Sequence, residues 1–262
     1  MRFAVGRCSP SQSHSLTLHH TPSHSHALTL TLTHSFGDAT IMTQRILSTV
    51  FTVALILSAT VPVQAEVGLG ADVVSRYIFR GTDFGNAATI QPSLSYSHGS
   101  LEIGAWSSWA ITGGAANEND LYATYSNGPI AVTVTDYYFP TPVLRPTDAR
   151  PEFLNFDADG GSHTLEIMGT VDLEAVSVTG ALNVHGDSED SMYLEVALPL
   201  SGEWSEGADV SVAVAAGNGG YTTGNKFAPV VLSVTASKDS YSASYILNPE
   251  SELTFLVFGK SF

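Results

Sequence analysis

The sequence has few charged residues, few basic residues and almost no cysteine. Charged residues make up 13% of its 262 positions, against about 25% in a typical soluble domain. The one cysteine, Cys8, allows neither a disulfide framework nor a cysteine-ligated metal site, and we expect no cofactor. The 10 Lys and Arg residues are outnumbered by 25 Asp and Glu residues, which argues against a nucleic-acid partner because phosphate groups are bound by basic patches.

Long apolar runs and helical periodicity are both missing after residue 65. Hydrophobic residues still make up 44% of the chain, and in this region they are diluted with Ser, Thr and Gly. A membrane barrel that shows alternate residues to lipid and to a polar lumen has this kind of composition.

The first 65 residues form two segments that precede the expected fold. Residues 1–41 are low in complexity and hold six of the nine histidines. Such a tract can bind metal, but we interpret it as sequence upstream of a start at Met42 that is not part of the native protein. Arg45, an apolar stretch and "VQA" then follow the pattern of a signal peptide. We predict a signal peptide over 42–65, cleaved after Ala65, and a single domain over 66–262.

Alternation with period 2 runs through almost all of 66–262, as in "VSVTGALNV" from Val176 and "DVSVAVAA" from Asp209. This pattern indicates half-exposed strands. We predict an all-β fold of about twelve strands, an even number as in bacterial barrels. The predicted strands are Val67–Phe79, Thr89–Tyr96, Leu101–Ile111, Asp120–Ser126, Ile130–Phe139, His163–Val171, Val176–His185, Met192–Leu200, Asp209–Gly217, Val230–Ser237, Tyr241–Leu247 and Glu252–Phe262.

The connections between these strands alternate in length. Short ones begin at Ser97, Ser126, Asp172 and Lys238, and "SGEWSEGA" from Ser201 is the longest of that set. Those in between are mostly longer, up to Pro140–Ser162. Short periplasmic turns and longer extracellular loops are the rule for outer-membrane barrels. We therefore expect an antiparallel, transmembrane, up-and-down β-barrel in the bacterial outer membrane, in contact with its lipid and lipopolysaccharide.

Charged residues are assigned to the lumen, because a Lys or Arg facing lipid at the bilayer midplane costs roughly 2–4 kcal/mol. The apolar set, such as Leu69, Val214 and Leu232, is assigned to lipid. The candidate lumen-facing charges are Asp72, Arg76, Arg80, Glu102, Glu166 and Glu195, the first three on one face of the first strand. Asp136 is the exception, since alternation places it on the lipid side. A bulge, or a position above the hydrocarbon, would resolve this.

Aromatic residues gather near the predicted strand ends, where girdles at the two membrane interfaces would place them. Packing in an ordinary core is the alternative. They are Tyr77, Phe79, Trp109, Tyr122, Tyr125, Tyr137, Tyr138, Phe139, Tyr241 and Tyr245. The sequence ends in Phe262 on an amphipathic strand, which resembles the C-terminal signal recognised by the outer-membrane assembly machinery.

Several segments resemble the TorF family of porins, a conserved bacterial outer-membrane family of unknown function. The family's features are an aromatic-rich first strand with Arg-Gly, then Gln-Pro and a Gly-Trp-Ser segment. They correspond here to Arg80-Gly81, Gln91-Pro92 and Trp106-Ser107. "NENDLYATYSNGPIAVTVTDYYFP" and the closing Lys260-Ser261-Phe262 also match. The resemblance implies an outer-membrane barrel and, more weakly, a channel; it brings no catalytic residues.

Three function classes remain open on the residues alone. Small and hydroxylated residues on the inward face favour a porin for small solutes or ions, and twelve strands lie between filled barrels of eight and open ones of sixteen. A barrel whose inner charges pair and brace the wall would be a non-conducting structural or adhesin barrel. A lipid-modifying enzyme would need a nucleophile and a base, for which His163 and His185 beside Ser162 and Asp187 are the candidates. We expect no enzyme.

Acidic residues in two predicted extracellular loops offer oxygen ligands that Ca²⁺ prefers. Their spacing fits no EF-hand, and we interpret them as a solvated rim, bridged to lipopolysaccharide by divalent cations. They are Asp148, Glu152, Asp157, Asp159, Asp187, Glu189 and Asp190.

Overall fold

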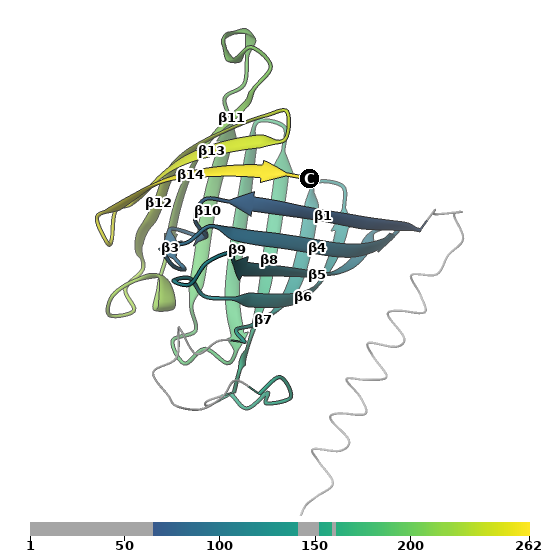
Figure 1. The fold of residues 1–262 in the computed structure, drawn as a ribbon, viewed down its shortest axis with the longest axis vertical. Coiled ribbons are helices and arrows are strands. Elements are labelled where there is room, and N and C mark those ends of the chain that lie inside the picture. The colour runs from purple at the N-terminus through teal and green to yellow at the C-terminus, as the bar shows by residue number, and fades with distance from the viewer. Residues whose placement is uncertain (1–64, 141–151, 159–160) are drawn as a thin grey trace, which may run out of the picture. The chain divides into compact units, whose positions relative to one another are not determined.

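Twelve antiparallel strands close into a barrel in the computed structural model, which describes residues 65–140, 152–158 and 161–262 (Figure 1). This confirms the predicted all-β fold, an antiparallel up-and-down barrel of about twelve strands. The low-complexity segment and all but Ala65 of the predicted signal peptide lie outside the described residues. The barrel strands are β1 (Glu66–Val74), β4 (Thr89–His98), β5 (Leu101–Ala110), β6 (Glu118–Asn127), β7 (Ile130–Tyr138), β8 (His163–Leu173), β9 (Val176–His185), β10 (Met192–Pro199), β11 (Asp209–Gly217), β12 (Ala228–Lys238), β13 (Tyr241–Asn248) and β14 (Leu253–Ser261).

The wall is an up-and-down meander in which each barrel strand pairs with the next one along the chain. The connection from β4 to β5 is residues 99–100 and that from β6 to β7 is 128–129, whereas those from β1 to β4 and from β7 to β8 are residues 75–88 and 139–162. Most short turns therefore lie at one end and most longer connections at the other, as the sequence predicts. Residues 200–208, between β10 and β11, are the exception at the short-turn end. Among the residues described, no helix is long and apolar enough to cross a membrane.

The barrel is closed by the pairing of β1 with β14. Three register pairs, from Asp72↔Ser261 to Val74↔Gly259, make this seam. Beyond them, the Phe262 N–H donates to the Ala71 carbonyl over 3.0 Å. On its other side β1 pairs with β4 along its whole length. The seam is thus the shortest ladder in the wall.

Side chains alternate between the two surfaces of the wall. In β12, Leu232 and Val234 are each 47% exposed on the outside, while Ser233 and Thr235 line a cavity inside the barrel. This alternation follows from the pleat, which sends successive side chains to opposite faces. The outer surface is therefore largely apolar, whereas the inner surface carries hydroxyl groups on this strand.

The first strand ends at Val74, five residues before the predicted end. The Ser75 hydroxyl accepts from the Phe258 N–H at 2.9 Å, and the chain then turns into the barrel (Figure 1). There β2 (Ile78–Phe79) and β3 (Thr82–Asp83) form a short antiparallel pair. Residues 75–88 are called the lumenal hairpin below. The prediction that Asp72, Arg76 and Arg80 share one face of the first strand is therefore wrong, because the strand ends before Arg76.

The lumenal hairpin reverses at Arg80 and Gly81, whose φ angles are +51° and +80°. Two positive φ angles are required by the type I′ turn, which suits tight hairpins. The Asn248 side-chain amide donates to the Gly81 carbonyl at 3.1 Å. A Cβ on Gly81 would lie 2.3 Å from the Val230 carbonyl oxygen. Glycine is therefore required here both by the turn and by contact with β12.

The buried core of the molecule lies against the tip of this hairpin. Its members come from β9 to β12, and Met168, Tyr221 and Ile246 pack around them. The core residues are Ala181, Tyr193, Ala215, Val230 and Val231. The interior of the barrel is thus packed around the hairpin on this side.

Candidate functional site: the lumen around the hairpin

The tip of the lumenal hairpin reaches the wall opposite its own strand. Arg80 forms a bidentate ion pair with Glu166 of β8, in which Nη2 donates to Oε1 at 3.0 Å. Nη1 also donates to the Tyr221 hydroxyl at 2.7 Å, and the Tyr137 hydroxyl donates to Glu166 at 3.0 Å. The Arg80 and Glu166 side chains are only 8% and 2% exposed. Two of the predicted lumen charges thus form the centre of a buried polar network.

Aromatic rings enclose the Arg80 guanidinium on two sides. The rings of Phe79 and Tyr193 each lie 4.6 Å from it, within the range of cation–π attraction. Burial alone would lower the pKa of Arg80, but the hydrogen bonds and charge of Glu166 outweigh burial and raise it. Arg80 therefore keeps its positive charge inside the barrel.

A second ion pair holds the base of the hairpin. Arg76 Nε donates to Asp83 Oδ1 at 2.9 Å, and the Gly85 N–H donates to the same oxygen at 3.0 Å. The hydrogen bond from Arg76 holds the pKa of Asp83 below its usual value. Because Arg76 and Asp83 come before and after the turn, their pairing stabilises the hairpin itself.

Cavities lie on both sides of the hairpin tip. The outer chamber, of about 310 Å³, is lined by residues near the long connections, among them Glu118, Asn183 and Asp187. The inner chamber, of about 370 Å³, is lined by residues closer to the short turns, among them Thr179 and Glu195. Phe79 borders both chambers. The hairpin tip therefore divides the lumen.

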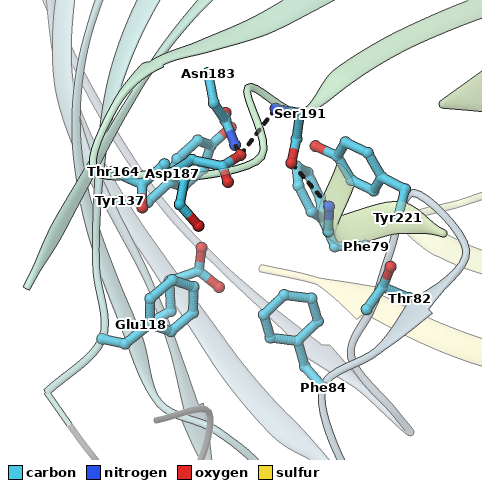
Figure 2. A pocket seen from close by; sticks show the side chains of 14 residues that line it. Phe79, Thr82, Phe84, Glu118, Tyr137, Thr164, Asn183, Asp187, Ser191 and Tyr221 are labelled. Atoms are coloured by element: carbon cyan, nitrogen blue, oxygen red, sulfur yellow. Dashed lines mark hydrogen bonds between the residues drawn. The ribbon is translucent and has the colours of Figure 1, made fainter. Parts of the chain in front are cut away.

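Asp187 supplies a fixed negative charge to the outer chamber (Figure 2). Its Oδ2 accepts from the Asn183 amide at 2.8 Å and from the Ser191 N–H at 3.0 Å, and Oδ1 accepts from the Glu189 N–H at 3.0 Å. Burial would raise the pKa of Asp187, but these hydrogen bonds outweigh burial and lower it. The carboxylate is therefore ionised near neutral pH with only uncharged donors around it.

Glu118 and Asp120 are site residues that the sequence analysis missed. They occupy alternate positions at the start of β6 and are 1% and 7% exposed. Burial, together with the nearby charge of Glu118, raises the pKa of Tyr77 well above its usual value. Within the described part of the chain, Glu118 Oε2 and Asp120 Oδ1 have no hydrogen-bond partner. In "ENDLY" they occupy alternate positions with Tyr122 and so lie on the same face of the strand as that residue. This alternation is the sequence signal that would have identified them.

The other predicted lumen charges lie apart from the Arg80–Glu166 pair. Glu102 accepts from Ser97 and Tyr122, each at 3.0 Å. Glu195 accepts from the Tyr193 hydroxyl. Asp72 lies near the seam, opposite Gln91 and Ser261 in the two ladders. Only Arg80 and Glu166 of the six predicted charges are brought into contact.

The prediction of aromatic girdles is wrong for several of the residues it covered. Tyr77, Phe79, Tyr137 and Phe139 line cavities inside the barrel. Phe79 lies 6.1 Å from Tyr137, and Tyr77 lies 5.6 Å from Trp106, between ring centroids. By contrast Trp109, Tyr125, Tyr241 and Tyr245 are 40–53% exposed. Some of these aromatic residues therefore pack around the lumenal hairpin inside the barrel, and others lie on its outer surface.

Asp136 stays on the outer side of the wall because it has a partner there. No register shift interrupts β7 at this position. The ladder between β8 and β9 does shift between Leu165 and Glu166, beside the residue that pairs with Asp136. His163 Nδ1 lies 2.8 Å from Asp136 Oδ1, and its Nε2 donates to the Phe153 carbonyl at 2.6 Å. His185 Nε2 likewise donates to the Phe156 carbonyl at 2.8 Å. These histidines fasten the β7–β8 connection to the barrel wall.

The loop acids considered as Ca²⁺ ligands fall partly outside the described residues, because Asp148 and Asp159 lie there. In the part of the chain that the structure describes, no group of three or more His, Cys, Asp or Glu side chains is placed to hold a metal ion.

Comparison with known proteins identifies one family. The sequence model of a family described as "bacterial protein of unknown function (Gcw_chp)" matches residues 58–228. The match spans β1 to the start of β12 and so includes the lumenal hairpin, Glu118, Glu166 and Asp187. A search of curated proteins finds no match.

Proposed function

The chain belongs to the Gcw_chp family of bacterial proteins of unknown function, and from its barrel we propose that it is an outer-membrane channel for passive diffusion of small solutes or ions. The two chambers inside the wall, of about 310 and 370 Å³, carry this proposal. They provide space, lined by both polar and aromatic side chains, on either side of one narrow layer at Arg80.

Membrane placement is supported by the outer surface and by the closure of the wall. A bilayer core offers no hydrogen bonds to the backbone, so a sheet can cross it only as a closed barrel. The alternating apolar outer face, with Leu69 at 84% exposure, suits contact with lipid. The signal peptide expected over 42–65, the terminal Phe262 and the resemblance to the TorF porins support the same placement.

A non-conducting barrel is the second candidate, and the Arg80–Glu166 pair favours it. The pair is almost fully buried and braces the hairpin across the lumen, as a structural or adhesin barrel would require. Catalysis by His163 and His185 has less support, because both rings are already bonded to loop carbonyls. Conduction is therefore the property that separates the candidates.

Single-channel recording in planar bilayers, with the purified and refolded protein, tests the channel. We expect small, reproducible current steps, because the hairpin leaves only a narrow path. Heat-modifiable migration on gels must show that the barrel is folded. Folded protein that gives no steps would overturn the channel in favour of the non-conducting barrel.

We further propose that the channel prefers cations. Among the described residues, no basic side chain pairs with Asp72, Glu102 or Glu195, whereas Arg76 and Arg80 are neutralised by Asp83 and Glu166. Rings of acidic side chains select cations in channels. The zero-current potential across a KCl gradient should therefore have the sign for K⁺ permeation, and a sign for Cl⁻ would contradict this.

A further inference from the structure

The outer chamber has the composition of a binding site for a small molecule. Its volume of about 310 Å³ lies at the lower end of the range for ligand pockets, which are mostly apolar with a few placed polar groups. The apolar part is aromatic. The rings that line it are those of Phe79, Phe84, Tyr137, Phe139 and Tyr221.

The polar part of the chamber carries negative charge. Asp187 contributes one ionised carboxylate, and its bonding partners are all uncharged. Glu118 contributes a second acidic side chain, which is 1% exposed, and Asp120 lies two residues further along β6. No described residue that lines the chamber is basic. Arg80 lies behind Tyr221, and Glu166 neutralises it.

Glu118 shows where a ligand would be held. Its side chain projects into the chamber, on the side away from Tyr221 (Figure 2). It is 1% exposed, and Oε2 has no hydrogen-bond partner among the residues that the structure describes. A buried carboxylate oxygen without a partner is costly. A donor on a bound molecule would remove that cost.

Aromatic faces beside carboxylates attract organic cations, because the rings add cation–π attraction to the charge interaction. A bare metal ion suits this chamber less well, since hard cations need six or more oxygen ligands. We propose that the outer chamber binds small organic cations, of the size of an arylalkyl ammonium, through Glu118 and Asp187 and the surrounding rings. This inference rests on the proposed function, because it names the class of solute that the channel would carry. Binding itself needs only the folded barrel.

Three probes of nearly equal shape distinguish binding that depends on the ligand's charge from binding that depends on its apolar ring alone. They are 2-phenylethylammonium, 2-phenylethanol and phenylacetate. Their binding is measured by isothermal titration calorimetry of the refolded protein in detergent micelles, with empty micelles subtracted. We expect the ammonium to bind at least about tenfold more tightly than the alcohol, and the carboxylate to bind least. Equal affinity of the ammonium and the alcohol, or no binding of any probe, would overturn the proposal.

Variants locate the binding. Glu118→Gln should remove most of the preference for the ammonium, whereas Glu102→Gln, a lumen carboxylate outside the chamber, should leave it unchanged. Phe84→Leu should weaken both the ammonium and the alcohol, and it keeps the test available if Glu118→Gln does not fold. Ammonium binding that is unaffected in folded Glu118→Gln or Phe84→Leu would place the site elsewhere and overturn the proposal.

The calorimetric titration tests the binding site, and the bilayer recording tests the channel, so that either can fail without the other. Specific binding together with silent bilayers would overturn the channel and keep the site. Regular currents without any heat of binding would overturn the site and keep the channel.

Discussion

Arg80 and Glu166 lie 86 residues apart in the sequence and form a bidentate ion pair inside the barrel. One comes from a turn that hangs between the first two wall strands and the other from the wall across the lumen. This contact holds the tip of the lumenal hairpin in a buried position across the lumen. It also explains why Tyr137 and Tyr221 direct their hydroxyls inward.

Removing one partner of this pair should open the lumen and weaken the fold. In Arg80→Ala the Glu166 charge stays buried without its partner, which costs about 3–5 kcal/mol in unfolding free energy. The loosened tip should also raise single-channel conductance. The double variant Arg80→Ala with Glu166→Ala should lose less stability than the two single changes added together. Denaturant unfolding in micelles and bilayer recording measure both effects. Unchanged conductance in folded Arg80→Ala would show that the hairpin is no barrier.

Gly81→Ala should displace the hairpin by a different route. The new Cβ would lie 2.3 Å from the Val230 carbonyl oxygen, and overpacking of this kind costs about 1–3 kcal/mol. Gly224→Ala is the matched control, because Gly224 also has a positive φ, of +75°, but nothing lies within 4 Å of its Cβ position. The difference in unfolding free energy between the two variants isolates the contact with β12. Equal destabilisation would mean that only the backbone conformation matters.

Acid should loosen the base of the hairpin through Asp83. Its pKa in the folded protein is held below its usual value of about 3.9. The pair with Arg76 therefore stabilises the fold fully above about pH 4, and this stabilisation is lost as the pH falls further. The pair is partly exposed, so the loss should be at most about 1 kcal/mol. Unfolding midpoints from pH 7 to pH 3 measure it.

Asp83→Asn serves as the reference for that titration, because it removes this carboxyl and leaves the others, including Asp187. The wild-type protein should lose stability more steeply than the variant at the acid end. Parallel curves would show that Asp83 does not contribute.

His163→Ala should free the β7–β8 connection without altering lipids. The ring contacts Asp136, donates to the Phe153 carbonyl and stacks on Phe156 with centroids 3.9 Å apart. Its loss should speed proteolysis near Phe153, while exposed His98 changed to Ala should have no effect. Altered outer-membrane lipid composition in the His163→Ala strain would instead support an enzyme.

The wall could be predicted from the sequence because a single physical rule governs it. Period-2 alternation and the lengths of the connections depend on local residues, as in β12, and the strand count followed from them. The lumenal hairpin could not be predicted in this way. Alternation continues past Ser75, and only contacts from Asn248 and Glu166, distant in sequence, decide that the chain turns inward.

The chemistry of the lumen was predicted in part for the same reason. Alternation identified Arg80 and Glu166 as charges to keep from lipid, but it carries no information on which residues meet. Glu118 was placed in a loop because the strand was predicted to begin at Asp120. The burial of Glu118 arises from Tyr77 and the hairpin, which no local pattern reveals.

The seam between β1 and β14 bears on the order in which the molecule assembles. Every other ladder of the wall joins successive strands, so those hairpins form at little entropic cost, whereas the seam must bring distant parts of the chain together. The lumenal hairpin directly follows β1, one of the two strands of that seam. Strands β4 to β13 can thus assemble around the lumenal hairpin while the barrel is still open. Pairing of β1 with β14 at the seam would then close a barrel whose interior the hairpin already occupies.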